Sequence, residues 1–237
     1  MTNMYVILPT DTSDMPEDGY PVLYLLHGLS DDHTKWLRST RIEEYAMKYN
    51  LCVVMPEAQC SFYCNMANGL PYDDFITKDL PEFIEKTFPV TKDREKTFIA
   101  GLSMGGFGAL KSGMREYKKY GACAGLSAVT DPFSKVDADD EYRYRLARSV
   151  LGESFKKRAE DDVYLSAQKL AKLPAEHRPR IYFAIGKSDF LYDDNQKFKA
   201  HLDSLNLPYT YEEGEGYHDW NFWDEYIQHA LKFFFGY

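Results

Sequence analysis

Short, unbroken apolar runs alternate along the chain with segments in which apolar residues recur every three or four positions. A short apolar run is typical of a strand buried on both faces, and the longer period is typical of an amphipathic helix. The runs that predict strands are 4–8, 22–26, 51–55, 97–100, 121–126 and 181–185, and Tyr209 with Tyr211 marks a last one. This order predicts an α/β fold with a mostly parallel central sheet and helices on both of its faces.

One segment departs from this alternation. Residues 131–174 are charged and helix-prone, and no strand is predicted among them. We expect this segment to be a small helical insertion that packs over the strand ends as a cap above the site. The length of 237 residues fits one α/β unit, so we predict a single domain over 1–237 that includes the insertion.

Composition and charge exclude several classes of function. The chain is 44% hydrophobic, and its net charge of −9 disfavours binding to a phosphate backbone. No apolar run approaches the roughly 20 residues that span a bilayer, and the first residues, MTNMYVILPT, carry no secretion signal. We therefore expect a cytoplasmic protein that binds neither nucleic acid nor membrane, and whose cysteines are reduced thiols rather than a disulfide or zinc site. The cysteines are Cys52, Cys60, Cys64 and Cys123.

The stretch FIAGLSMGGFGAL surrounds Ser103 with glycines at the junction of a predicted strand and a predicted helix. Residues 101–105 read GLSMG and match G-x-S-x-G, in which a sharp turn strains the serine backbone and leaves no room for side chains two positions away. This turn presents the hydroxyl above the sheet and leaves the N–H of Met104 free to bind developing negative charge. No P-loop or G-x-G-x-x-G pattern occurs, so a phosphate-binding glycine loop is excluded. Ser103 is the predicted nucleophile.

A nucleophilic serine needs a histidine base, which follows the serine in the chain order of this kind of fold. His218 lies in EGEGYHDW, a glycine-bearing loop after the last predicted strand, and we favour it as the base. The alternatives lie in a charged connection or within helical patterns: His177, His201 and His229.

The acid that orients the histidine should follow the predicted strand 181–185. The segment GKSDFLYDDN places Asp189 in the turn itself, and we favour this residue. The less favoured candidates are Asp193 and Asp194, whose position suggests helix capping, Asp131 after an earlier strand, and Asp219, which is too close to His218.

A second oxyanion donor is expected in the loop after an early strand. The segment LLHGLSDD follows the predicted strand 22–26, with Gly28 allowing a turn and Leu29 offering its N–H. We interpret His27 as a structural residue that holds this loop.

Taken together, these motifs resemble the esterase D-like, or putative-esterase, family of α/β-hydrolases. The resemblance covers nearly the whole chain, through YPVLYLLHGLSDDHTKW, IEEYAMKYNLCVVMPEA, SFYCNM, FIAGLSMGGFGALK, SDFLYDDN and YHDWNFWDEYI. It implies the same roles as the residue-by-residue reading: Ser103, Asp189 and His218 as catalytic triad, Leu29 and Met104 as oxyanion donors, and no metal or organic cofactor.

The family contains tributyrin-type esterases, feruloyl and acetyl esterases, and S-formylglutathione hydrolases. Members that act on glutathione thioesters typically carry a histidine on each side of the S-M-G-G core, where this chain has Leu102 and Phe107. The resemblance therefore favours the tributyrin and feruloyl branch, with a small-molecule ester or an acylated oligosaccharide as substrate.

For the substrate pocket we predict contributions from Trp36, Trp220 and aromatic residues of SFYCNM. Trp36 lies just past the expected oxyanion loop and Trp220 two residues after His218, and packing in the core is the alternative for both tryptophans. The alternatives are an S-formylglutathione hydrolase, an acyltransferase with the same triad, and a catalytically inactive carbohydrate-binding protein of this fold. The sequence is also compatible with a homo-oligomer.

Overall fold

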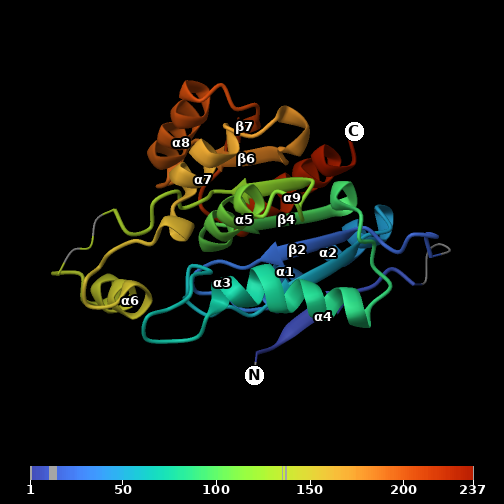
Figure 1. Cartoon of the computed structure of the whole chain (residues 1–237), viewed down its shortest axis with the longest axis horizontal. Coiled ribbons are helices and arrows are strands. Elements are labelled where there is room, and N and C mark those ends of the chain that lie inside the picture. The colour runs from blue at the N-terminus through green and yellow to red at the C-terminus, as the bar shows by residue number, and fades with distance from the viewer. Residues whose placement is uncertain (1, 11–14, 135, 137, 237) are drawn as a thin grey trace.

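The computed structural model describes residues 2–10, 15–134, 136 and 138–236 (Figure 1). Within these residues, seven strands form one sheet in the order β1-β3-β2-β4-β5-β6-β7. β1 is antiparallel to β3, and all other neighbouring pairs are parallel. The strands are β1 (Met4–Ile7), β2 (Val22–Leu26), β3 (Cys52–Pro56), β4 (Thr97–Leu102), β5 (Ala122–Leu126), β6 (Arg180–Gly186) and β7 (Thr210–Gly214). The predicted mostly parallel α/β sheet is therefore confirmed.

Helices cover both faces of the sheet, as predicted (Figure 1). The longer ones are α2 (Ile42–Lys48), α4 (Leu80–Thr87), α5 (Met104–Arg115), α6 (Glu141–Leu151), α7 (Val163–Leu170), α8 (Tyr192–Ser204) and α9 (Trp220–Phe235). The shorter ones are α1 (Lys35–Ser39), α3 (Tyr72–Asp74) and a π-helical turn, Phe75–Asp79, that joins α3 to α4.

Alternate side chains of each strand enter two separate cores. On β2, Val22, Tyr24 and Leu26 pack with residues of α4, α5, α7 and α8, whereas Leu23 and Leu25 pack with residues of α1, α2 and α9. Every residue of β2 is buried, as expected of a strand covered on both faces.

The segment 131–174 between β5 and β6 contains α6, α7 and the 3₁₀ turn Ala159–Asp161, with no strand among its described residues. α7 packs close to the sheet, whereas α6 projects at one end of the molecule (Figure 1). The description of this segment as a cap within a single domain stays a prediction.

A buried ionic cluster attaches this segment to α5. The Lys111 side chain is fully buried, and its Nζ lies 2.9 Å from Asp161 Oδ1 and 3.0 Å from Asp73 Oδ1. Burial alone would lower the pKa of Lys111, but the neighbouring Cys64, Asp73 and Asp161 outweigh it and raise this pKa to about 12. Lys111 therefore carries its charge inside the core and joins α5, α3 and the Ala159–Asp161 turn.

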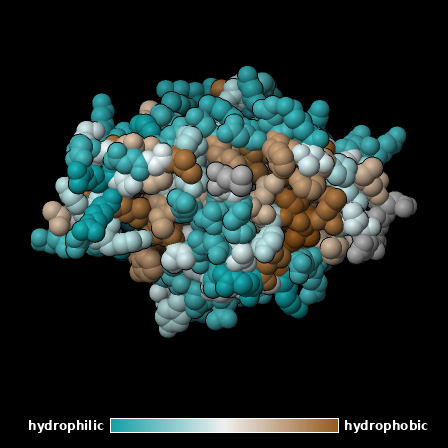
Figure 2. Space-filling view, turned by 90° about the horizontal axis from the view of Figure 1, so that it is seen from below, coloured by the Kyte–Doolittle hydropathy of each residue, from teal (hydrophilic) through white to brown (hydrophobic). Residues whose placement is uncertain are grey.

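The surface of the protein carries polar residues together with some exposed hydrophobic side chains. The face in Figure 2 is largely hydrophilic, with hydrophobic residues gathered in patches. Large exposed apolar side chains include Leu70, in the loop before α3, and Phe83, on α4. Among the described residues, no helix is long and apolar enough to cross a membrane. All four cysteines are free thiols.

Candidate active site

Ser103 occupies a sharp turn between β4 and α5. Its φ of 51° and ψ of −113° lie outside the region that most residues adopt, as the G-x-S-x-G pattern predicts. A Cβ on Gly105 would come 2.4 Å from the Leu26 carbonyl oxygen, and one on Gly101 would come 2.4 Å from the Gly105 backbone. The two glycines are thus required because β2, β4 and α5 approach one another closely at this turn.

The turn places the Ser103 hydroxyl beside a histidine and an aspartate from two distant loops. His218 Nε2 lies 3.0 Å from Ser103 Oγ, and His218 Nδ1 lies 2.8 Å from Asp189 Oδ2. The Asp189 side chain is fully buried, and its Oδ1 accepts a hydrogen bond from the Leu191 N–H at 2.8 Å. The structure therefore brings together the three residues that the sequence analysis favoured.

Most of the other histidines and aspartates considered above have separate partners. His201 Nε2 lies 3.1 Å from the Tyr164 carbonyl oxygen, and His229 Nδ1 lies 2.6 Å from Glu212 Oε2. Asp219 caps the N-terminus of α9, where it accepts hydrogen bonds from the N–H groups of Asn221 and Phe222. Asp131 and Asp194 form ion pairs with Lys157 and Lys197.

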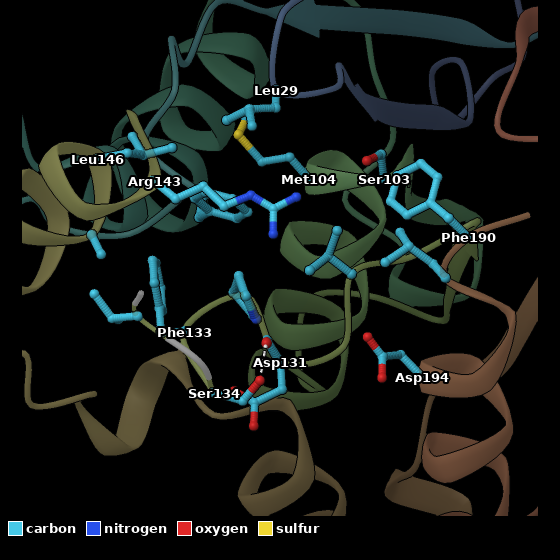
Figure 3. A pocket seen from close by; sticks show the side chains of 16 residues that line it. Leu29, Ser103, Met104, Asp131, Phe133, Ser134, Arg143, Leu146, Phe190 and Asp194 are labelled. Atoms are coloured by element: carbon cyan, nitrogen blue, oxygen red, sulfur yellow. Dashed lines mark hydrogen bonds between the residues drawn. The ribbon is translucent and has the colours of Figure 1, made fainter. Parts of the chain in front are cut away.

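The loop after β2 lies on the other side of the serine. Leu29 and Met104 both line the cavity at Ser103 (Figure 3). Met104 is the first residue of α5, so its N–H belongs to the helix end that has no intrahelical acceptor. This arrangement is consistent with the predicted oxyanion pair.

The structure bears out the interpretation of His27 as a structural residue of this loop. It is buried; its Nε2 accepts from the Ala58 N–H at 3.0 Å, so the proton is on Nδ1, which donates to the Gly28 carbonyl at 2.8 Å. Asp31 Oδ2 accepts from the Gly28 N–H at 3.2 Å. Burial raises the pKa of Asp31 above its ordinary value.

A cavity of about 280 Å³ opens at Ser103 (Figure 3). Most of its wall is apolar, and the segment 131–174 contributes about half of the lining. The lining residues are Leu29, Phe62, Ser103, Met104, Val129, Asp131, Pro132, Phe133, Ser134, Val136, Arg143, Leu146, Ala147, Phe190, Leu191 and Asp194. Of the two aromatic residues of SFYCNM that the pocket prediction covered, Phe62 lines the cavity and Tyr63 does not. Tyr63 is buried, and its hydroxyl donates to the His27 carbonyl at 3.0 Å.

The structure corrects the prediction for the two tryptophans, neither of which lines this cavity. Trp36 is 1% exposed, packs in the core, and donates its Nε1–H to the Leu26 carbonyl at 3.0 Å. Trp220 packs edge-on against Trp36, with ring centroids 5.2 Å apart, and against Trp223 at 5.1 Å. Proximity in sequence to the predicted catalytic residues did not determine the direction of these side chains, because both pack with the core on that face of the sheet.

Several of the lining residues, among them Phe190 and Arg143, were not singled out by the sequence analysis. Phe190 is 73% exposed, and its ring centroid lies 4.5 Å from that of His218. Phe190 directly follows Asp189, but closeness in sequence to a predicted catalytic residue gave no dependable signal, since it failed for Trp36 and Trp220. Arg143, on α6, gave no signal either, because charge on a helix is usually a solvated face.

Comparisons with known proteins identify the family of the chain. The family model described as "Putative esterase" matches residues 1–234. An acetyl esterase of Caldicellulosiruptor saccharolyticus is 34% identical over 244 residues, which cover 98% of this chain and 91% of that protein.

Two solved structures from Staphylococcus aureus share the α/β-hydrolase fold with this chain. Fluorophosphonate-binding serine hydrolase F is 35% identical, with a TM-score of 0.85 and coverage of 98% of this chain and 92% of that one. An S-formylglutathione hydrolase is 36% identical, with a TM-score of 0.81 and the same coverage.

Proposed function

Because the chain belongs to the esterase family of α/β-hydrolases, and is a carboxylic ester hydrolase by that membership, we propose that it is a serine carboxylesterase that hydrolyses short acyl or aromatic acyl esters. The observation that carries the proposal is the continuous hydrogen-bonded chain from Ser103 through His218 to Asp189, at 3.0 and 2.8 Å. An acyl-enzyme mechanism needs a nucleophile, a base and a group that orients the base, and these contacts supply all three.

In the first half of the reaction, Ser103 Oγ attacks the ester carbonyl carbon while its proton passes to His218 Nε2. The Asp189 carboxylate holds the Nδ1 proton and stabilises the imidazolium. The oxyanion accepts hydrogen bonds from the N–H groups of Leu29 and Met104, with the N-terminus of α5 behind it. Collapse of the tetrahedral intermediate breaks the bond to the alcohol, which leaves with the proton from Nε2.

In the second half, a water molecule attacks the acyl-enzyme carbonyl. His218 Nε2 takes a proton from this water and returns it to Ser103 Oγ as the carboxylic acid leaves. No step needs a metal ion or an organic cofactor. Transfer of the acyl group to an alcohol would use the same first half, and competing alcohols in the assay distinguish it from hydrolysis by their ester products.

The size of the cavity supports a small acyl group. A volume of about 280 Å³ is at the lower end of ligand pockets, and Leu146, Phe133 and Phe62 restrict it. We expect 4-nitrophenyl acetate and butyrate to be hydrolysed with a higher kcat/KM than octanoate. A preference for octanoate would contradict the small-acyl assignment.

The second candidate is a thioester hydrolase, favoured by the 36% identity to an S-formylglutathione hydrolase. The two candidates are separated by kcat/KM values for 4-nitrophenyl acetate, methyl ferulate, acetylated xylo-oligosaccharide and S-formylglutathione. Labelling of Ser103 by a fluorophosphonate probe supports either enzyme, whereas a chain that stays unlabelled and hydrolyses none of these substrates would be the inactive binding protein.

A further inference from the structure

An arginine from α6 extends into the otherwise mostly apolar cavity at Ser103. Figure 3 shows the Arg143 side chain reaching from α6 with its guanidinium directed into the cavity. Among the described lining residues it is the one cationic side chain. The proposed function leaves this charge without a role.

The position of Arg143 on its helix makes the feature specific. Arg143, Leu146 and Ala147 line the cavity, and their spacing puts them on one face of α6. An arginine on the face that borders the cavity keeps a permanent positive charge within reach of whatever the cavity binds.

The protein partner of Arg143 leaves most of its donors available. Within the described part of the chain, Arg143 forms an ion pair with Asp140, and its Nε lies 3.4 Å from Asp140 Oδ2. Both side chains are substantially exposed. Such an exposed ion pair contributes little to stability. The two Nη groups carry the remaining N–H donors of the guanidinium.

The acidic residues of the cavity do not compete strongly for this arginine. Asp131 Oδ1 lies 3.2 Å from Lys157 Nζ, and Asp194 Oδ1 lies 2.8 Å from Lys197 Nζ. Each carboxylate already has a lysine partner, although Asp131 shares Lys157 with Asp162. An anion that enters from solvent is therefore the natural partner of the Arg143 guanidinium.

The geometry also indicates which part of the substrate meets Arg143. His218 must protonate the leaving alcohol, and Phe190 contacts His218, so the alcohol occupies the Phe190 side of Ser103. In Figure 3 the guanidinium of Arg143 and the ring of Phe190 lie on opposite sides of Ser103. The acyl chain therefore extends toward Arg143.

Resting on the proposed esterase function, we infer that Arg143 binds a carboxylate at the far end of the acyl chain. The preferred substrates are then monoesters of short dicarboxylic acids. The carboxylate accepts hydrogen bonds from the guanidinium, while the methylene groups between the carboxylate and the ester lie against the apolar wall that includes Leu146 and Phe133.

The test compares 4-nitrophenyl hemisuccinate, hemiglutarate and hemiadipate with the corresponding methyl-capped neutral diesters. The quantity measured is the ratio of kcat/KM for each acid to that for its neutral counterpart, after subtraction of the rate with Ser103→Ala. Arg143→Gln should lower the best ratio by about tenfold, as expected for a lost charge-assisted hydrogen bond at a partly exposed site. Arg143→Lys should retain part of the preference.

Arg145→Gln is the matched control. Arg145 lies on the same helix with a side chain 76% exposed, against 75% for Arg143; it pairs with Glu141 and does not line the cavity. Its substitution should leave the ratio unchanged. The Kd of glutarate is also measured by calorimetry with the Ser103→Ala protein. This Kd should increase when Arg143→Gln is added to Ser103→Ala.

Two outcomes overturn the inference. One is an unchanged ratio in Arg143→Gln, including the case in which kcat/KM falls equally for acids and neutral diesters. The other is a preference that follows a carboxylate on the alcohol, measured with 4-carboxyphenyl acetate against its methyl ester. Hydrolysis of the neutral esters reports on the proposed function independently, so failure of the inference and failure of the esterase assignment are distinguishable.

Discussion

His218 Nε2 lies 3.0 Å from Ser103 Oγ, although the two residues are 115 positions apart in the sequence. Trp223, one turn into α9, holds the imidazole from the other side: their rings meet edge to face with centroids 4.9 Å apart, and Trp223 Nε1 donates to Ser127 Oγ at 3.1 Å. Ser127 directly follows β5, the neighbour of β4 in the sheet. The histidine loop is thus fastened to the sheet beside the strand that carries the serine.

The first prediction concerns the nucleophile. Ser103→Ala should reduce kcat for 4-nitrophenyl butyrate by about 10⁴-fold or more, because the acyl-enzyme can no longer form. The alanine side chain lacks only the hydroxyl and fits the same turn. The thermal midpoint of unfolding should therefore remain close to that of the parent. Esterase turnover near the parent value in a homogeneous sample of the variant would exclude Ser103 as nucleophile.

The second prediction concerns the acid. Asp189→Asn places an amide where Oδ2 now accepts from the His218 imidazole, and this favours the wrong imidazole tautomer. We expect kcat to fall by about 10⁴-fold at neutral pH. Asp219→Asn is the control, since Asp219 caps α9 and an asparagine preserves the cap. A comparable loss in both variants would contradict the separate roles.

The third prediction concerns the buried lysine of α5. Lys111→Met leaves Asp161 and Asp73 without their shared buried cation, and should lower the free energy of unfolding by about 3 kcal/mol. Arg158 and Arg115 remain beside these carboxylates and limit the loss. Urea denaturation monitored by tryptophan fluorescence measures the difference.

Lys86→Met is the comparison for that experiment. Lys86 forms an exposed pair with Glu82 on α4, and its loss should change the free energy of unfolding far less than the loss of Lys111 does. If Lys111→Met were no more destabilising than Lys86→Met, the buried cluster would not be what holds the Ala159–Asp161 turn to α5.

The fourth prediction is a pH dependence in the oxyanion loop. Burial raises the pKa of Asp31 in the folded protein, so the unfolded chain releases this proton at a lower pH than the folded one. At a pH below the ordinary pKa of aspartate, Asp31 is protonated in both the folded and the unfolded chain. It then does not lower the stability of the fold. As pH rises above that value, ionisation favours the unfolded chain until the folded carboxyl has also ionised.

Asp31→Asn keeps an oxygen that can accept from the Gly28 N–H and removes the titration. The variant should therefore have a higher thermal midpoint than the parent at pH 7, and this advantage should shrink as pH is lowered toward 4. Because Asp31 is only partly buried, we expect a gain below about 1 kcal/mol. An advantage that grew on acidification would have the wrong sign for a raised pKa.

The sequence by itself determined the elements and the order of the chemical groups. Apolar periodicity marked the strands because each is buried on both faces, and the glycines around Ser103 marked the turn because no side chain fits between β2, β4 and α5. His218 and Asp189 could be selected since each lies in a loop at the carboxyl end of a predicted strand, where parallel strands present their ends together.

Only the tertiary structure decided which side chains face the substrate. Trp36 and Trp220 lie close in sequence to the predicted catalytic loops but pack on each other, Trp36 buried and Trp220 partly buried. Arg143 and Phe133, by contrast, reach the cavity from the segment 131–174. Periodicity reports whether a residue is buried or exposed, but not what lies opposite it. The direction of a side chain in a loop, and the position of α6 beside the cavity, depend on packing between segments that are far apart in the chain.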